Sequence, residues 1–154
     1  MKTSSKIKLD LLPIEKSRLK ANKIKVLDIP NYSSKELSRL LDVPTIRAME
    51  IIALVEFQCI PSIGIKFAKD LISMGYYSLE ELKDKNGAKL IEELELFLGC
   101  WIDPCVEDQF RLVVEYANHR DNSKRWWDYT EERKKYRLEN GYPANRPIKA
   151  WFEN

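Results

Sequence analysis

Residues 46–57 form the segment that most limits what this chain can fold into. Nearly every position in it is apolar, namely Ile46, Met49, Ile51, Ile52, Leu54, Val55 and Phe57. A helix with apolar side chains on all its faces must be covered by other elements on every side, as in the middle of a helical bundle. A chain of 154 residues is long enough to provide that cover within one domain.

The flanking sequence predicts more helices and contains no competing strand pattern. Start and stop signals predict helices over residues 34–41, from Ile65 to a stop at Gly75, over 90–98 with a stop at Gly99, from Asp103-Pro104 to residue 117, and over 130–139 with a stop at Gly141. Pro44 is expected at the first position of the helix that contains residues 46–57. The sequence therefore predicts an all-α protein, built as a compact helical bundle.

Polar residues between these helices carry further expectations. Ser78 and Glu81 have the spacing of a capping box, and Asn86-Gly87 is a turn signal. The carboxylates at 92, 93 and 95 are expected on the wet face of their helix. Glu107 and Asp108 are expected at the positive end of theirs.

Charge is strongly segregated along the chain, although the formal net charge is only +2. Residues 1–27 carry eight Lys/Arg against two acidic residues, whereas residues 78–115 carry four basic residues against ten acidic ones. We predict a weakly ordered basic N-terminal arm at 1–27, a helical domain at 28–120, and a C-terminal helix with an extended tail at 121–154. The tail is expected to pack on the domain through Trp151 and Phe152.

The sequence also indicates in which cellular compartment the protein is expected. No apolar run is long enough to cross a bilayer, and no secretory signal pattern opens the chain. The three cysteines, Cys59, Cys100 and Cys105, do not form a disulfide framework. We therefore expect a cytoplasmic protein without a membrane partner.

Residues 58–64 join two predicted helices by a very short connection. Ile60 and Ile63 are expected to point into the helix crossing, and Ala68 is small where the second helix approaches the first. Gly64 is expected to let the backbone turn with its amide groups exposed. Exposed amides at the positive end of a helix form an anion site, to which Lys66 and Lys69 add charge.

The run Ile60-Pro61-Ser62-Ile63-Gly64-x-x-x-Ala68 resembles the helix-hairpin-helix motif. The resemblance implies that the amides of Ser62, Ile63, Gly64 and Ile65, with Lys66 and Lys69, contact DNA backbone phosphates without reading bases. Ser62 stands where the motif has its first glycine. Residues 43–48 and 101–104 resemble degenerate partner hairpins with a structural role.

The resemblance extends from about residue 37 to residue 128. The hairpin, Cys105-x-x-x-x-Phe110-Arg111 and Trp126-Trp127 together resemble the bacterial pathogenicity-locus family, whose members are often labelled mitomycin resistance proteins. This family is mostly uncharacterised, so the resemblance implies a fold more than an activity.

Three other chemistries were weighed against simple structural roles. Cys59, Cys100, Cys105 and His119 are four zinc-ligand types, but their spacing is not that of a zinc knuckle, so no metal site is predicted. His119 is expected to be a solvated residue at the end of its helix. Trp126-Trp127 could stack on bases, but a role in capping the core and holding the tail is favoured.

No grouping of residues supports catalysis, and no cofactor is expected. The leading hypothesis is a non-enzymatic, sequence-independent DNA-binding protein that uses one helix-hairpin-helix. The alternative is a protein-interaction adaptor that presents the acidic segment 78–115 and the aromatic tail to a partner.

Overall fold

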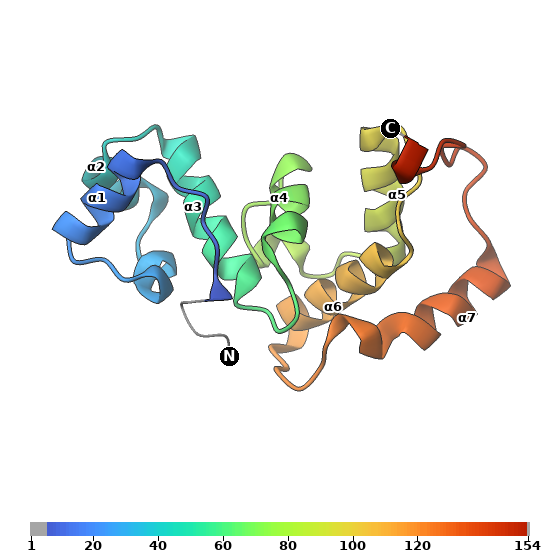
Figure 1. Cartoon of the computed structure of the whole chain (residues 1–154). Coiled ribbons are helices and arrows are strands. Elements are labelled where there is room, and N and C mark those ends of the chain that lie inside the picture. Colours follow the sequence, from blue (N-terminus) through green and yellow to red (C-terminus); the bar gives the residue numbers. More distant parts are fainter. Residues whose placement is uncertain (1–5, 154) are drawn as a thin grey trace. The chain divides into compact units, whose positions relative to one another are not determined.

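The computed structural model describes residues 6–153, and its regular elements are all helical (Figure 1). This confirms the all-α prediction. The α-helices are α1 (Pro13–Ala21), α2 (Ser34–Leu41), α3 (Thr45–Gln58), α4 (Ile65–Ser73), α5 (Gly87–Leu98), α6 (Cys105–His119) and α7 (Thr130–Asn140). Short 3₁₀ turns are η2 (Val26–Asn31), η3 (Glu80–Leu82), η4 (Trp126–Tyr129) and η5 (Trp151–Glu153). None of the described helices is both long enough and apolar enough to span a membrane.

Contacts divide the chain into two units, residues 1–78 and residues 79–154. Each unit has a core of its own and is described separately. The boundaries predicted from the sequence, after residues 27 and 120, both fall inside these units. That division into arm, domain and tail stays a prediction.

Helix α3 is the centre of the first unit, as its composition predicts. Helices α2 and α4 and the turn η2 pack on it (Figure 1). Its residues Ile51, Val55 and Phe57 are fully buried, whereas Ile46 in its first turn is 48% exposed. Pro44 is the N-cap of α3 rather than its first residue. The cover is therefore extensive but not complete, since Ile52 and Glu56 are also partly exposed.

The prediction of a weakly ordered arm over residues 1–27 is wrong for the part that the structure describes. Residues 13–21 form α1, and Ile7 and Leu9 are each only 7% exposed. The buried side chain of Gln58 holds the extended segment before α1, because its Oε1 accepts from the Lys8 amide at 3.0 Å and its Nε2 donates to the Lys8 carbonyl. The side chain of Gln58 thus satisfies the backbone amide and carbonyl of Lys8, as a neighbouring strand would in a sheet. Residues 1–5 lie outside the described residues.

A buried ion pair fastens α1 to α3. The carboxylate of Glu15, which is 1% exposed, accepts from Arg47 Nε and Nη2, both at 2.8 Å, and from the Leu12 amide at 2.9 Å. The hydrogen bonds from Arg47 hold the pKa of Glu15 below its usual range despite its burial. The lysine-rich segment is ordered because this carboxylate has a partner on the central helix.

Helices α5 and α6 form the core of the second unit. Gly99 ends α5 in the left-handed conformation with φ 72°, as predicted. Asn86 is not a free turn: it is the N-cap of α5, and its side chain accepts from the amides of Ala88 and Lys89. Asp103 accepts from the Cys105 amide at 2.9 Å, but the N-cap of α6 is Pro104, so the helix begins one residue later than expected.

Close approach of α5 and α6 depends on Gly87. A Cβ atom at this position would lie 2.9 Å from both Cα and N of Arg111 on α6. That is closer than non-bonded carbon atoms come, so the first turn of α5 rests directly on the α6 backbone. The expected short helix after Ser78 is only the 3₁₀ turn η3, which packs on α6.

Helix α7 and the tail that follows it have few apolar residues to bury. Buried carboxylates hold them instead. Glu95, which was expected to face water, is 1% exposed. Glu107 and Asp108 lie in the first turn of α6, as expected, and are 1% exposed and fully buried. Arg137 donates to Glu107 at 2.9 Å, and Arg133 donates to Asp108 at 2.9 Å. The prediction of a wet face at Glu95 is wrong because helical spacing cannot show which arginine will reach a carboxylate.

We expect Gly87→Ala to lower the free energy of unfolding by about 1–3 kcal/mol, the usual cost of overpacking a close contact. Neither of the facing atoms can move aside, because both belong to the α6 backbone. Urea denaturation followed by circular dichroism measures the change. Gly64→Ser is the control, because a Cβ at Gly64 meets no atom within 4 Å and serine suits an N-cap. Equal destabilisation by the two variants would contradict this account of Gly87.

We expect Glu15→Gln to lower the free energy of unfolding at pH 7 by about 1–3 kcal/mol, because it leaves Arg47 without its buried partner. The folded-state pKa of Glu15 is depressed, so its contribution is present above its unfolded pKa of about 4.3. The contribution is lost as the pH falls through the lower folded pKa.

The difference between wild type and Glu15→Gln should therefore shrink below about pH 4. Urea titrations from pH 3 to pH 7 test this, with Glu139→Gln as the control at an exposed glutamate. A difference that stays constant down to pH 3 would mean that Glu15 does not act through its charge.

Candidate nucleic-acid interface

The predicted short connection between two helices lies between α3 and α4. Helix α3 ends at Gln58 and α4 begins at Ile65, so six residues make the connection. The Ile63 amide donates to the Ile60 carbonyl at 3.2 Å, which closes the turn. Ile60, Ile63 and Ala68 are fully buried, as the sequence predicts for the helix crossing.

Gly64 has a different role from the one predicted. Its φ of −106° and ψ of −177° are extended backbone that any residue can adopt. The left-handed residue of the turn is Ser62, with φ 67°. Gly64 is exposed, and a Cβ there would stand in open space. The glycine therefore does not relieve strain; it leaves the approach to the start of α4 clear.

The first amides of α4 point out of the turn. The Ala68 amide is the first that reaches back to the helix N-cap, donating to the Gly64 carbonyl at 3.1 Å. By helix geometry the amides of Gly64, Ile65 and Lys66 have no partner inside the helix. The Ile63 amide is already used in the turn. Three backbone donors thus lie together at the positive end of α4.

The two lysines predicted to support these amides differ in their surroundings. Lys66 is exposed, and its charge opposes the burial that raises the pKa of Asp70. Lys69 Nζ lies 2.7 Å from Asp10 Oδ2, and this pair holds the pKa of Asp10 below its usual range. Both members are more than half exposed, so the pair is weak and open to exchange.

The Lys69–Asp10 pair reveals a neighbour that the sequence did not predict. It brings the segment before α1, which carries the lysines of the predicted arm, beside α4. Exposed lysines of this segment and of α1 include Lys6, Lys8, Lys16 and Lys20. A groove of about 530 Å³ lies along the same region, lined among others by Leu9, Lys16 and Lys20. The contact that joins this basic region to α4 spans 59 residues of sequence, so local patterns do not predict it.

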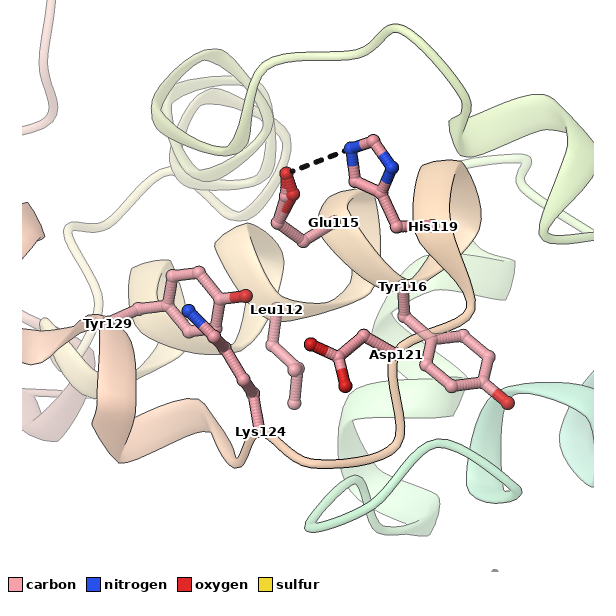
Figure 2. A pocket seen from close by; sticks show the side chains of 7 residues that line it. All are labelled: Leu112, Glu115, Tyr116, His119, Asp121, Lys124 and Tyr129. Carbon is pink, nitrogen blue, oxygen red and sulfur yellow. Dashed lines mark ion pairs between the residues drawn. The ribbon is translucent and has the colours of Figure 1, made fainter.

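A small pocket lies at the end of α6 (Figure 2). Its volume is about 200 Å³, and Figure 2 shows Glu115 and His119 pointing toward each other, with Glu115 Oε1 3.5 Å from His119 Nε2. Burial and the nearby Glu115 carboxylate raise the pKa of Tyr129 to about 12. The tyrosine hydroxyl therefore stays protonated near neutral pH and is a poor base there.

The remaining candidate ligands have structural surroundings. His119 ends α6 with its side chain 69% exposed, as expected. None of Cys59, Cys100 and Cys105 forms a disulfide. Within residues 6–153, no three His, Cys, Asp or Glu side chains are grouped so that they could hold a metal ion.

Trp126 and Trp127 begin η4 and touch each other edge to face, with ring centroids 5.4 Å apart. Trp126 is half-buried and Trp127 is 55% exposed. The tryptophan whose ring meets the tail is Trp101, 5.3 Å from Trp151. The favoured role for the Trp126-Trp127 pair in holding the tail thus falls at least in part to Trp101, which the sequence did not single out for this purpose.

Comparison with known proteins adds one family and one relative. The family described as Pathogenicity locus matches residues 50–135, which include the hairpin, α4, α5, α6 and the beginning of α7. The mitomycin resistance protein McrB of Streptomyces lavendulae is 28% identical over 74 residues, which cover 48% of this chain and 70% of that protein. No solved structure is significantly similar.

We expect Ser62→Gly to raise the free energy of unfolding by up to about 1 kcal/mol, because glycine adopts a positive φ without a steric cost. Thermal unfolding measures the change. Ser73→Gly, within helix α4, is the control and should lower stability. A lower stability of Ser62→Gly would show that contacts of the Ser62 side chain outweigh the backbone cost.

Proposed function

The chain belongs to the Pathogenicity locus family, and we propose that it is a non-enzymatic DNA-binding protein. Its hairpin between α3 and α4 would act as a helix-hairpin-helix and contact backbone phosphates without reading the sequence. The residues proposed for this contact are Ser62, Gly64, Ile65, Lys66 and Lys69. Ile63, also expected from the sequence, is left out because its amide donates to the Ile60 carbonyl.

One observation carries the proposal: an open anion site and a basic segment lie together on the first unit. The amides of Gly64, Ile65 and Lys66 share the positive end of α4, where a phosphate oxygen is stabilised. No side chain at Gly64 obstructs the approach. The lysine-rich segment held at Asp10 supplies further positive charge within the same unit.

The role of Lys69 follows from its weak internal pair. An exposed lysine–aspartate pair contributes at most about 1 kcal/mol, so exchanging Asp10 for a phosphate costs little. Binding would then depend mainly on the number of phosphates neutralised, as is general for duplex DNA. The carboxylate of Asp70, beside Lys66, limits the affinity. We expect weak, salt-sensitive binding.

The alternative function is a protein-interaction adaptor. The exposed aromatic residues of the tail favour it, since Phe152 is 66% exposed and Trp151 is 38% exposed. The acidic segment favours it less than its composition suggests, because Glu95, Glu107 and Asp108 are buried.

Location and pathway complete the proposal. The absence of disulfides among Cys59, Cys100 and Cys105 is consistent with a reducing compartment, so we place the protein in the cytoplasm. The relative from Streptomyces lavendulae is named for mitomycin resistance. A contribution of this chain to such resistance is part of the same proposal.

Fluorescence anisotropy of labelled duplex DNA across a salt series tests DNA binding. We expect log K to fall linearly with log salt for the wild type. Lys66→Glu/Lys69→Glu should weaken binding and reduce the slope by about 2, since about 0.9 of slope is lost for each phosphate contact.

Lys134→Glu/Lys135→Glu is the matched control, with the same change of charge at two exposed positions of α7. It should keep the wild-type slope. No binding of the wild type at low salt would reject DNA binding. Equal loss of slope in the two double variants would reject the hairpin as the binding site.

A further inference from the structure

The C-terminal tail follows a defined path over the second unit, although it forms no helix between Gly141 and η5. It crosses the loop between α5 and α6, and the terminal 3₁₀ turn lies beside α5 (Figure 1). Two kinds of contact hold it: an arginine in a carboxylate pocket and a short backbone pairing. Both resemble the ways in which proteins bind extended peptides.

Arg146 is the first anchor. Its Nε and Nη2 donate to Glu95 Oε1 and Oε2 at 2.9 and 3.0 Å. Its guanidinium also lies 3.6 Å from the centroid of the Tyr142 ring and 5.4 Å from that of the Trp101 ring. Glu95 is 1% exposed and is oriented by the Ile102 amide, which donates to it at 2.8 Å. The pocket therefore recognises a planar, doubly donating cation.

The second anchor is backbone pairing at Trp101. The Trp101 amide donates to the Lys149 carbonyl at 2.8 Å, and the Trp151 amide donates to the Trp101 carbonyl at 2.9 Å. The residue between them, Ala150, is 2% exposed. The pairing fixes the direction of the bound segment, and the space around Ala150 admits only a small side chain.

Aromatic contacts complete the site. The ring of Trp101 meets the edges of Trp151 and Phe152, with centroids 5.3 and 5.9 Å apart. Between the two anchors, the side chains of Ile148 and Lys149 do not contribute to recognition, because Ile148 is 95% exposed and Lys149 is also exposed. The pattern recognised is an arginine, a half-buried residue at Pro147, two exposed residues, a small residue and two aromatic residues.

We propose that Glu95, Trp101 and Ile102 form a peptide-recognition site that the chain's own tail occupies. Its ligand would be an extended segment of a partner protein, with an arginine four residues before a small residue that aromatic residues follow. The tail would then act as an internal competitor that the partner displaces. This inference does not depend on DNA binding.

The tail is suited to exchange because little apolar surface holds it. Ala150 is the one residue of 141–153 that is buried, and the rest of the attachment is polar or lies at an exposed rim. Release of the tail breaks the Arg146–Glu95 pair, and the arginine of a partner segment would restore it at Glu95. Such local opening costs less free energy than global unfolding. Pro143 and Pro147 also prevent the released tail from extending α7 as a helix.

A partner protein is a better occupant than the tail of a second copy. Exchange of tails between two copies replaces each contact by an identical one, so it gains no contacts and loses the freedom of two separate molecules. A partner segment with no site of its own gains the arginine pocket and the backbone pairing outright.

Anisotropy of a labelled peptide with the sequence of residues 145–153, NRPIKAWFE, tests the site in the full chain. In the wild type the tethered tail competes at about millimolar effective concentration, which weakens apparent binding. Arg146→Ala removes the anchor of the tail and leaves the pocket intact. We expect this variant to bind the peptide at least about tenfold more tightly than the wild type. Lys149→Ala, which changes a side chain that does not contribute to recognition, should bind as the wild type does.

Changes in the peptide test specificity without altering the protein. With the Arg146→Ala chain, replacing the arginine of the peptide by alanine, or its Ala150 equivalent by leucine, should weaken binding at least about tenfold, whereas replacing the Ile148 equivalent should not. Equal binding of wild type and Arg146→Ala, or of all peptides, would overturn the proposal.

Sedimentation velocity distinguishes the source of the occupant. We expect wild type and Arg146→Ala to remain monomeric with increasing concentration. A wild-type dimer that the free peptide dissociates would assign the site to the tail of a second copy and overturn the assignment to a partner protein.

Discussion

Buried carboxylates are the constraint on which the rest of this structure depends. Four of them are at most 1% exposed, and a carboxylate without a partner at such a position would cost several kcal/mol or become protonated. Each is paired with an arginine between 25 and 51 residues away. The pairs are Glu15–Arg47, Glu95–Arg146, Glu107–Arg137 and Asp108–Arg133. Through them α1, α7 and the tail, which have little apolar surface to bury, are attached to the apolar helices.

These pairs change the meaning of the segregated charge. The acidic segment 78–115 does not form a uniformly acidic surface, because part of its charge is neutralised inside the second unit by arginines of α7 and the tail. In the first unit most lysines stay exposed, and the Lys69–Asp10 pair joins them to the hairpin. A polyanion is therefore best accommodated on the first unit, and an arginine-bearing peptide on the second.

Much of the fold could be predicted because it depends on local signals. The apolar pattern of α3, the left-handed glycines at 75 and 99, and the short connection before Ile65 each act within a few residues. The geometry around the candidate site was predictable to the same extent, since the short connection and the start of α4 lie where the sequence predicted them. The role predicted for Gly64 was wrong. The sequence shows where the glycine is, but it does not show that Ser62, and not Gly64, adopts the positive φ in this turn.

The sequence by itself determined the class of fold, the positions of the helices after α1 and the place of one short connection. Periodicity and capping suffice for this, since both act over a turn or two of helix. Only the tertiary structure decided which charges are buried, that the N-terminal segment is ordered beside α4, and that the tail occupies a site on Glu95 and Trp101. These outcomes depend on pairs of residues far apart in the chain, and a carboxylate looks the same in the sequence whether water or an arginine satisfies it.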